Sequence, residues 1–375
     1  MQTVRHDTSV ISLFLCGDVM TGRGIDQVLP YSVNPVLYEP YLHDAREYVE
    51  LAETAHGALS RPVAFDYIWG DALEELERAG VDSRIVNLET AITTAEEACP
   101  KEINYRMHPA NIGCITAARI DCCCLANNHV LDWGYAGLEE TIATLDRAGV
   151  AHVGAGRTAA EARAPAVLDL GVRGRVLVFA LGSPASGVPF GWAAASDRPG
   201  VNMVESLSDE TAHRVADEVR TYKQPGDIAL VSIHWGGNWG YEIPWAQTLF
   251  AHRLIDEGVD LIHGHSSHHA KAIEVYKDHL ILYGCGDSVT DYEGIGGYEE
   301  FRGDLSVMFL PALEVMSGRL LELRMIVLQS RRFRLNRASS ADVHWLSNLL
   351  NRICACFGTR FDVVEGHSLR LKNEN

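Results

Sequence analysis

The sequence predicts an α/β fold, because short apolar segments rich in β-forming residues alternate with amphipathic helical segments through most of the chain. Five of the apolar segments end in Asp, Glu, Asn or His. Open α/β sheets bind ligands at the carboxyl ends of their strands. The alternation therefore predicts the fold class, and the polar strand ends predict one composite site.

The first half of the chain alternates strands with helices. Strands are expected at 10–16, 84–86 and 122–126, and helices at 71–79, 109–119 and 135–148. Gly80 and Gly149 follow the first and third helices, where glycine commonly ends a helix. Residues 38–59 form a helical or irregular insertion. This half therefore predicts parallel strands joined by helical crossovers.

The second half begins in the same way and then changes. Strands are expected at 166–170, 175–180 and 228–233, with helices at 207–222 and 246–257. From residue 272 onward consecutive strands follow, at 272–276, 279–283, 305–310 and 320–328, as in a meander. Residues 340–375 contain an amphipathic helix and room for one strand. We expect a main domain over residues 1–330 and an appendage over 331–375.

Composition limits the possible partners. The chain has 375 residues, of which 47% are hydrophobic and 22% charged, typical of a globular protein with a sizeable core. Its net charge of -18 argues against nucleic acid or an anionic membrane as a partner, and it also disfavours a polyanionic substrate. The odd count of nine cysteines favours reduced thiols. With no apolar run of spanning length, we expect a cytoplasmic protein.

Histidines are concentrated after the strand that begins near residue 261. Four of them lie in the seven residues 263–269, beside a glycine that lets the chain turn. Neutral imidazoles donate nitrogen lone pairs to divalent cations. Four other strands end in Asp18, in Asn87 to Glu89, in Asn127 to His129 and in His234. Together these residues predict metal-assisted or acid–base chemistry.

The strand-end motifs resemble those of the CapA family, named for poly-γ-glutamate capsule synthesis proteins, within the calcineurin-like metallophosphoesterase superfamily. The matching motifs are Gly17-Asp18-Val19-Met20, Asn87-Leu88-Glu89-Thr90, Ala126-Asn127-Asn128-His129, His234-Trp235-Gly236, Gly264-His265-Ser266-Ser267-His268 and Tyr283-Gly284-Cys285-Gly286-Asp287. The resemblance covers about residues 10 to 300. It implies a calcineurin-like four-layer α/β/β/α sandwich.

Three departures from the superfamily pattern change the expected metal content. Val19 and Met20 follow Asp18 where Asp-x-His is usual, Asn87-Leu88-Glu89 replaces the bridging aspartate motif, and the final Gly-His-x-His is one residue longer. These losses weaken the case for two metals that clamp a phosphate. We therefore expect one divalent cation, Ca²⁺, Mg²⁺ or Mn²⁺. The expected ligands are Asp18, Glu89, Asn128, His234 and His265.

The remaining polar residues suggest acid–base roles. His129 with Asp132 forms one candidate pair, and His268 with Asp287 a second. The expected catalytic residues are His129, Asp132, His265, His268, Asp18 and Asp287. Trp235, Trp239 and Tyr241 follow His234 and either pack the loop or bind an apolar substrate group. His263 is expected in the core and His269 at the surface.

Three functions remain open from the sequence. The first, which we favour, is metal-dependent Cα epimerisation of a residue in a peptide, as in the family members that modify lasso peptides. The second is a metal-dependent hydrolase of a γ-glutamyl amide or a phosphoester. The third is a component of capsule poly-γ-glutamate synthesis. The first two require an acid and a base at the same site.

Overall fold

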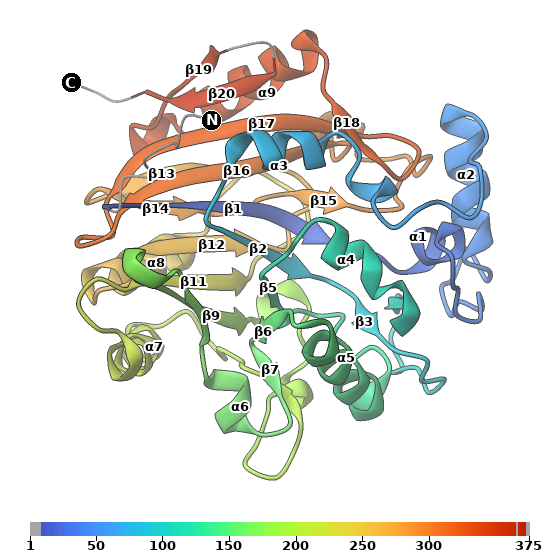
Figure 1. The fold of residues 1–375 in the computed structure, drawn as a ribbon, viewed down its shortest axis with the longest axis horizontal. Helices are drawn as coiled ribbons and strands as arrows, with labels where there is room; N and C mark the ends of the chain where they lie inside the picture. The colour runs from blue at the N-terminus through green and yellow to red at the C-terminus, as the bar shows by residue number, and fades with distance from the viewer. Residues whose placement is uncertain (1–8, 365–366, 373–375) are drawn as a thin grey trace.

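The computed structural model describes residues 9–364 and 367–372, which form two stacked β-sheets with helices outside them (Figure 1). The larger sheet has ten strands in the order β19-β20-β17-β16-β1-β2-β5-β6, with β15 paired to β1 and β18 to β17. Its strands are β1 (Val10–Val19), β2 (Ser83–Leu88), β5 (Cys122–Cys124), β6 (Ala151–Val153), β15 (Asp287–Val289), β16 (Leu305–Glu314), β17 (Leu320–Ser330), β18 (Leu335–Arg337), β19 (Phe361–Val364) and β20 (Ser368–Leu371).

The second sheet has six strands in the order β13-β14-β12-β11-β9-β8. They are β8 (Ala166–Asp169), β9 (Arg175–Gly182), β11 (Ile228–His234), β12 (Leu261–His265), β13 (Ile273–Tyr276) and β14 (His279–Leu282). The inner strands β9, β11, β12 and β14 are parallel, as are β1, β2, β5 and β6 of the larger sheet. Two short ladders pair β3 (Ala91–Ile92) with β4 (Arg106–Met107) and β7 (Ala155–Gly156) with β10 (Gly200–Val201).

Helices cover both outer faces of the stacked sheets. They are α1 (Arg23–Val28), α2 (Arg46–His56), α3 (Ala72–Ala79), α4 (Gly113–Ala117), α5 (Gly134–Ala148), α6 (Ala159–Arg163), α7 (Asp209–Tyr222), α8 (Trp245–Asp256) and α9 (Ser340–Ile353). Apolar residues of α1 to α5 share one buried cluster with the outer face of the larger sheet, and those of α7 and α8 pack on the second sheet. The layers therefore run α/β/β/α, which confirms the expected fold.

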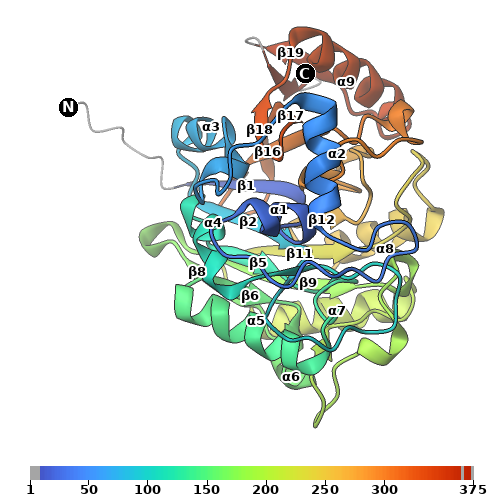
Figure 2. The same ribbon diagram turned by 90° about the vertical axis from the view of Figure 1, so that its right-hand side faces the viewer.

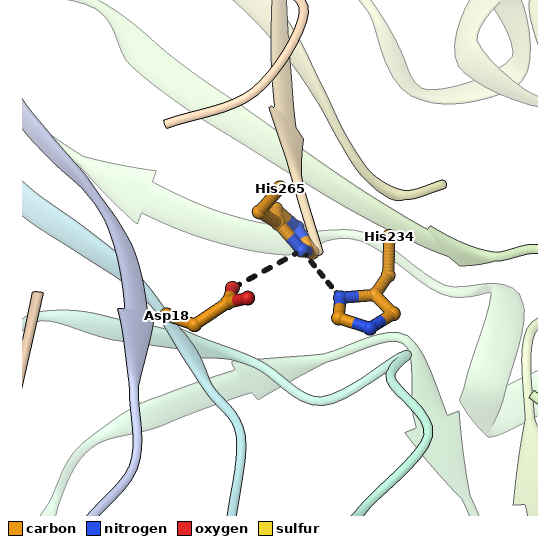
Figure 3. Close-up of side chains that lie close together, drawn as sticks. All are labelled: Asp18, His234 and His265. Carbon is orange, nitrogen blue, oxygen red and sulfur yellow. Dashed lines mark hydrogen bonds and ion pairs between the residues drawn. The ribbon is translucent and has the colours of Figure 1, made fainter. Parts of the chain in front are cut away.

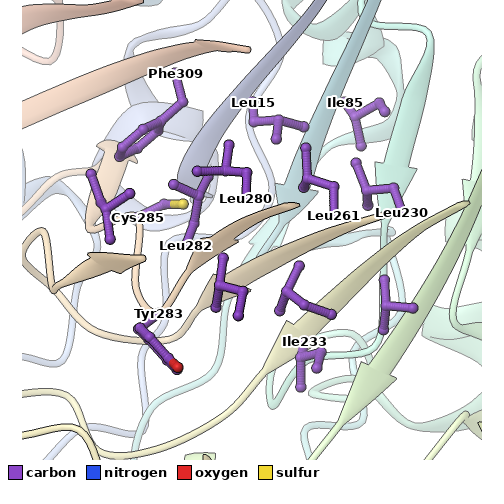
Figure 4. Close-up of a cluster of buried hydrophobic side chains, with 14 of the residues drawn as sticks. Leu15, Ile85, Leu230, Ile233, Leu261, Leu280, Leu282, Tyr283, Cys285 and Phe309 are labelled. Carbon is purple, nitrogen blue, oxygen red and sulfur yellow. The ribbon is translucent and has the colours of Figure 1, made fainter. Parts of the chain in front are cut away.

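The main core lies between the two sheets (Figure 4). Leu15 and Ile85 of the larger sheet belong to the same buried cluster as Leu230 and Leu261 of the second sheet, and all four are fully buried. Each such side chain contributes roughly 1.5–3 kcal/mol when it is removed from water. This packing fixes the position of one sheet relative to the other, and with it the strand ends that both sheets contribute to the site.

Two segments of the larger sheet approach each other closely at the C-terminal end of β1. Asp18 of β1 stands in register with Asp287 of β15. A Cβ atom at Gly17 would lie 1.6 Å from the carbonyl oxygen of Gly286, so only glycine permits this approach. The two carboxylates thus come from segments far apart in the sequence. Figure 2 views the molecule from the side to which these strand ends point.

Several predicted elements differ in detail. The strands after residue 272 do not form one meander, because β13 and β14 join the second sheet while β15, β16 and β17 join the larger one. The predicted helix at 109–119 is a 3₁₀ turn, Pro109–Ile112, followed by α4. The insertion at 38–59 contains α2.

The C-terminal segment carries α9 and two strands, β19 and β20, of which β20 extends the larger sheet beside β17. The domain boundary expected near residue 331 falls between the paired strands β17 and β18. The outer ends of the expected domains, residues 1–8 and 373–375, lie outside the described residues. Within the described part of the chain, none of the helices is both long and apolar enough to cross a membrane.

Candidate metal centre and acid–base site

The polar strand ends of both sheets meet at one place. Asp18 is the penultimate residue of β1, Glu89 follows β2, His129 follows β5, and His234 and His265 are the last residues of β11 and β12. All five side chains are at most 6% exposed. Because each follows a buried parallel strand, the sheets fix their backbone positions. The structure therefore brings the predicted strand-end residues into one site.

Asp18, His234 and His265 form a cradle of three ligand atoms (Figure 3). His234 Nδ1 lies 2.9 Å from His265 Nδ1, and His265 Nδ1 lies 3.7 Å from Asp18 Oδ1. All three ligand atoms lie within 4.8 Å of one another. Atoms that share an ion at about 2.0–2.2 Å stand roughly 3–4 Å apart. The three side chains therefore fit one divalent cation.

Both imidazoles of the cradle favour the neutral form. Burial lowers the pKa of His234 and of His265 well below its usual value, and neighbouring histidines lower it further. His234 Nε2 lies 3.0 Å from Asn128 Oδ1, an acceptor, so Nε2 carries the proton and Nδ1 offers its lone pair to the cradle. Asn128, which was expected to be a ligand, lies outside the three-atom cradle and contacts the opposite nitrogen of His234.

Asp18 is held by two hydrogen-bond donors, one at each carboxylate oxygen. Asn87 Nδ2 donates to Oδ1 at 2.7 Å, and the Ser266 amide donates to Oδ2 at 3.2 Å. Burial raises the pKa of Asp18 to about 7, and the nearby charge of Asp287 adds to the rise. A bound cation would favour the ionised form. Asn87, at the position of the expected bridging aspartate, thus orients the carboxylate.

Glu89 lies beside the cradle and outside it. Its Oε1 is 3.6 Å from His234 Nε2 and 3.9 Å from His129 Nε2. Burial raises the pKa of Glu89 well above its usual value, and the charge of Asp18 raises it further. Glu89 was expected among the ligands; the structure places it between the cradle and the His129 pair, where it can donate a proton.

His129 and Asp132 form a tightly held pair. His129 Nδ1 donates to Asp132 Oδ2 at 2.6 Å, which leaves Nε2 as the free lone pair. Asp132 also accepts from Lys101 Nζ and from the Tyr105 amide, each at 2.6 Å. The Tyr105 ring stacks on the imidazole at 3.9 Å. Burial lowers the pKa of His129 to about 4, although Asp132 opposes the shift. His129 is thus a neutral imidazole suited to act as a base.

His268 and Asp287 form the second pair. His268 Nδ1 lies 3.1 Å from one oxygen of Asp287 and 3.2 Å from the other. Burial lowers the pKa of His268, but the charge and hydrogen bond of Asp287 outweigh it, so that the pKa is raised. Asn238 Nδ2 lies 3.1 Å from Nε2, a contact that the imidazolium satisfies after rotation of the amide. His268 is thus suited to act as an acid.

Both pairs open onto one cavity of about 800 Å³. Its lining includes His129, His268 and Asp287, together with Trp239 and Arg331. A cavity of this volume matches the size of a small peptide or oligomer. The two predicted pairs therefore face the same substrate space.

The aromatic residues after His234 take three different positions. Trp239 lines the cavity and stacks on Tyr298 at 4.0 Å. Tyr241 lies behind it, against His269 and Phe301. Trp235 is 2% exposed and stacks on Tyr283 in the core, so of its two expected roles its position fits packing and not contact with a substrate.

Two other histidine predictions can be compared with the structure. His263 is fully buried and hydrogen-bonded, as expected of a core residue. His269 was expected at the surface, yet it is 1% exposed and packs between Trp239 and Phe301. His265 has both ring nitrogens engaged, one of them in the cradle, so its position favours ligation over proton transfer.

Sequence reasoning missed two residues that support the first pair. Lys101 and the Tyr105 amide both hold Asp132, and they come from a segment without regular structure. No spacing or strand pattern marks them. Their role follows only from the fold, which places residues 99–105 beside residues 128–132.

The comparisons with known proteins agree with this architecture. A sequence profile described as "Bacterial capsule synthesis protein PGA_cap" matches residues 12–292. A Mycobacterium tuberculosis protein named "Probable polyglutamine synthesis accessory protein" is 48% identical over 353 residues, which cover 94% of this chain and 93% of that protein. The "PGA biosynthesis protein CapA" of Bacillus subtilis is 26% identical over 291 residues, 76% of this chain and 65% of that protein. The "Capsule biosynthesis protein CapA" of Bacillus anthracis is 24% identical over 290 residues, 77% and 62% respectively. The profile match spans most of the chain, including the cradle and both histidine–aspartate pairs, and the chain therefore belongs to the bacterial capsule synthesis protein family PGA_cap, the CapA family.

Proposed function

We propose that this protein is a metal-dependent hydrolase that cleaves an amide bond of a glutamate polymer during the synthesis of that polymer. The name of the Bacillus subtilis relative supports the polymer, since it describes PGA biosynthesis, whereas the name of the Mycobacterium tuberculosis relative describes polyglutamine, the amide counterpart of polyglutamate. The arrangement of two histidine–aspartate pairs beside a three-atom metal cradle supports the chemistry. That arrangement is the observation on which the proposal chiefly depends.

The residues of the site have separate roles in amide hydrolysis: metal binding, proton abstraction and proton donation. A divalent cation in the cradle would polarise the scissile carbonyl or lower the pKa of a water molecule. His129 Nε2, held as a lone pair by the hydrogen bond from Nδ1 to Asp132, takes the proton of the attacking water. His268, paired with Asp287, gives a proton to the departing nitrogen.

The ligand set also bears on the identity of the cation. Two imidazole nitrogens and one carboxylate favour a borderline ion such as Mn²⁺, Fe²⁺ or Zn²⁺ over Ca²⁺ and Mg²⁺, which prefer oxygen. Of the three ions expected from the sequence, Mn²⁺ fits this donor set best. We therefore choose Mn²⁺ as the first ion to test.

The cavity provides local cations in spite of the overall negative charge. Lys101 lines it, and its side chain is 25% exposed. Two of the three N–H groups of Lys101 face Asn128 O and Asp132 Oδ1. His129 Nδ1 is itself a donor, so the third N–H is free for a substrate carboxylate. Arg331 also lines this cavity. These two positions suit the repeated carboxylates of a glutamate chain.

Cα epimerisation of a peptide residue is a second candidate, and the same two pairs favour it. An epimerase needs a base on one face of Cα and an acid on the other. His129 and His268 meet that need in their opposite protonation preferences. The substrate class for this chemistry is a ribosomally made peptide of the lasso type.

One experiment separates these functions. A γ-linked glutamate oligomer, or a test peptide, is incubated in D₂O with the Mn²⁺-loaded protein and followed by mass spectrometry. After the exchangeable deuterons are washed out in H₂O, hydrolysis gives two fragments whose masses sum to the substrate plus one water. Epimerisation gives an intact chain with deuterium at one Cα. His129→Ala and His268→Ala should abolish the product, whereas His344→Ala, an exposed residue of α9, should not. An oligomer that is unchanged at every Mn²⁺ concentration would refute the proposal.

A further inference from the structure

A pair of tyrosines connects the two histidine–aspartate pairs. The ring of Tyr105 stacks on His129 at 3.9 Å, and the ring of Tyr292 meets His268 edge-on at 5.2 Å. The two phenolic oxygens lie 2.8 Å apart and share a hydrogen bond. Both tyrosines line the same cavity as the two histidines. The tyrosine pair therefore bridges the base and the acid of the site at the wall of the substrate space.

The exposure of the two side chains sets the direction of this hydrogen bond. The distance alone allows either hydroxyl to donate. Tyr105 is 3% exposed, and within the described part of the chain its hydroxyl has no hydrogen-bond partner other than Tyr292. A buried O–H without an acceptor is costly, so the Tyr105 hydroxyl donates and Tyr292 Oη accepts. Tyr292 is half-buried at the cavity wall, and its own O–H is left to donate into the cavity.

Arg23 holds both rings in place. Its guanidinium lies 4.8 Å from the ring centroid of Tyr105 and 5.5 Å from that of Tyr292. Arg23 is itself buried and paired with Glu39 at 2.9 Å and with Asp291 at 2.5 Å. Burial raises the pKa of both phenols, although the charge of Arg23 opposes the shift, so each phenol keeps its proton at neutral pH. A hydroxyl that accepts a hydrogen bond also becomes the stronger donor.

We infer that Tyr292 is a catalytic residue that donates a hydrogen bond to the reacting carbonyl oxygen, and that Tyr105 is the positioning residue that directs it. This inference rests on the proposed function and adds the group that stabilises the charge formed during the reaction. His129 takes a proton from water as the water oxygen bonds to the carbonyl carbon, and the π electron pair of the C=O bond moves to its oxygen. The Tyr292 O–H donates to this oxyanion and keeps its proton. The electron pair returns as the C–N bond breaks and the nitrogen takes the proton of His268.

The competing interpretation is that the two tyrosines only pack against the histidines. Packing depends on the rings, which phenylalanine retains, so removal of a hydroxyl would then have little effect on the rate. A hydrogen bond to the oxyanion depends on the Tyr292 hydroxyl and is strongest in the transition state. The two interpretations therefore make opposite predictions for Tyr292→Phe.

Steady-state cleavage of a γ-linked glutamate oligomer by the Mn²⁺-loaded protein provides the first test. Tyr292→Phe should lower kcat about 10²–10³-fold and leave KM within about threefold of wild type, as expected for the loss of one oxyanion donor. Tyr105→Phe keeps the Tyr292 O–H and should lower kcat less than Tyr292→Phe does. Tyr67→Phe is the matched control, because it removes the hydroxyl of another half-buried tyrosine, whose hydrogen bond to the carbonyl of Arg332 lies outside the cavity lining. Full kcat in Tyr292→Phe, or a larger loss in Tyr105→Phe, would overturn the inference.

Neutron diffraction from a wild-type crystal grown in D₂O tests the direction of the hydrogen bond without any substrate. The hydroxyl deuterium of Tyr105 should lie between the two oxygens, and that of Tyr292 should point into the cavity. A Tyr292 deuterium directed at Tyr105 Oη would overturn the inference. If the deuterium positions are as expected while no glutamate oligomer is cleaved, only the proposed function fails, and the variants are then ranked by deuterium exchange at Cα of a test peptide.

Discussion

Replacement of Asp132 by asparagine tests the acid–base pair most sharply. Asp132 is fully buried and accepts three hydrogen bonds, two of them at Oδ2 and one at Oδ1. The Oδ2 donors are His129 Nδ1 and the Tyr105 amide, and the Oδ1 donor is Lys101. In Asp132→Asn the two donors at Oδ2 will hold the amide oxygen there, so the amide NH₂ faces Lys101. The orientation of His129 is preserved while the negative charge is lost.

The structure sets the expected size of the effect. Two charge-assisted hydrogen bonds become neutral ones, a loss of about 1 kcal/mol each. The contact with Lys101 is lost, but that side chain is 25% exposed and can be rehydrated, at a cost of up to ~1 kcal/mol. The free energy of unfolding should therefore fall by about 2–3 kcal/mol. The rate should fall about 10²-fold, at the low end of what a general base contributes, because Asn cannot stabilise the imidazolium as it forms.

Two measurements check this prediction. Urea unfolding followed by tryptophan fluorescence gives the stability, and cleavage of a glutamate oligomer at saturating Mn²⁺ gives the rate. Asp132→Ala should be less stable than Asp132→Asn, because it leaves the His129 and Tyr105 N–H groups buried without an acceptor. The reasoning is refuted if Asp132→Asn retains the full rate, or if its loss of activity disappears once the folded fraction is taken into account.

Three further predictions concern the rest of the site. Burial raises the pKa of Asp18 to about 7, and a metal ligand must be deprotonated. The affinity for Mn²⁺ should therefore fall about tenfold per pH unit below pH 7 and level off above it. Calorimetric titrations at several pH values would show a constant affinity if Asp18 is not a ligand. His268→Ala should reduce the rate by about 10²–10⁴ while the urea midpoint stays close to wild type, and a parallel loss of stability would indicate a structural role. Gly17→Ala should destabilise the fold by ~3 kcal/mol or more and weaken Mn²⁺ binding, because the added Cβ would lie 1.6 Å from Gly286 O. Gly237→Ala is the control and should have neither effect, because there is open space around its added Cβ. Equal urea midpoints and Mn²⁺ affinities for the two variants would contradict this prediction.

The fold was largely predictable because its strands are short, apolar and followed by helices with clear ends. The glycines after α3 and α5 adopt the left-handed conformation that ends a helix, as their positions indicated. The assignment of strands β13 to β17 to two different sheets was not predictable. Sequence pattern gives the period of a strand but does not specify its neighbour in space.

The candidate site was predictable at the level of strand ends and less so at the level of atoms. Strand ends in parallel sheets meet, so Asp18, His234 and His265 were expected together. The roles of Asn128 and Glu89 depend on which of their side-chain atoms contact the histidines, and the sequence does not specify those contacts. His269 was expected at the surface, and Trp235 was expected either to pack the loop or to contact a substrate; packing between the loop and the core buries both.

A crystal of the protein soaked in Mn²⁺ tests the central claim most directly. An anomalous difference map should show one strong peak within coordination distance of Asp18, His234 Nδ1 and His265 Nδ1. The account is contradicted if the strand-end cradle shows no peak at saturating Mn²⁺, or if the ion is bound through His265 Nε2 instead.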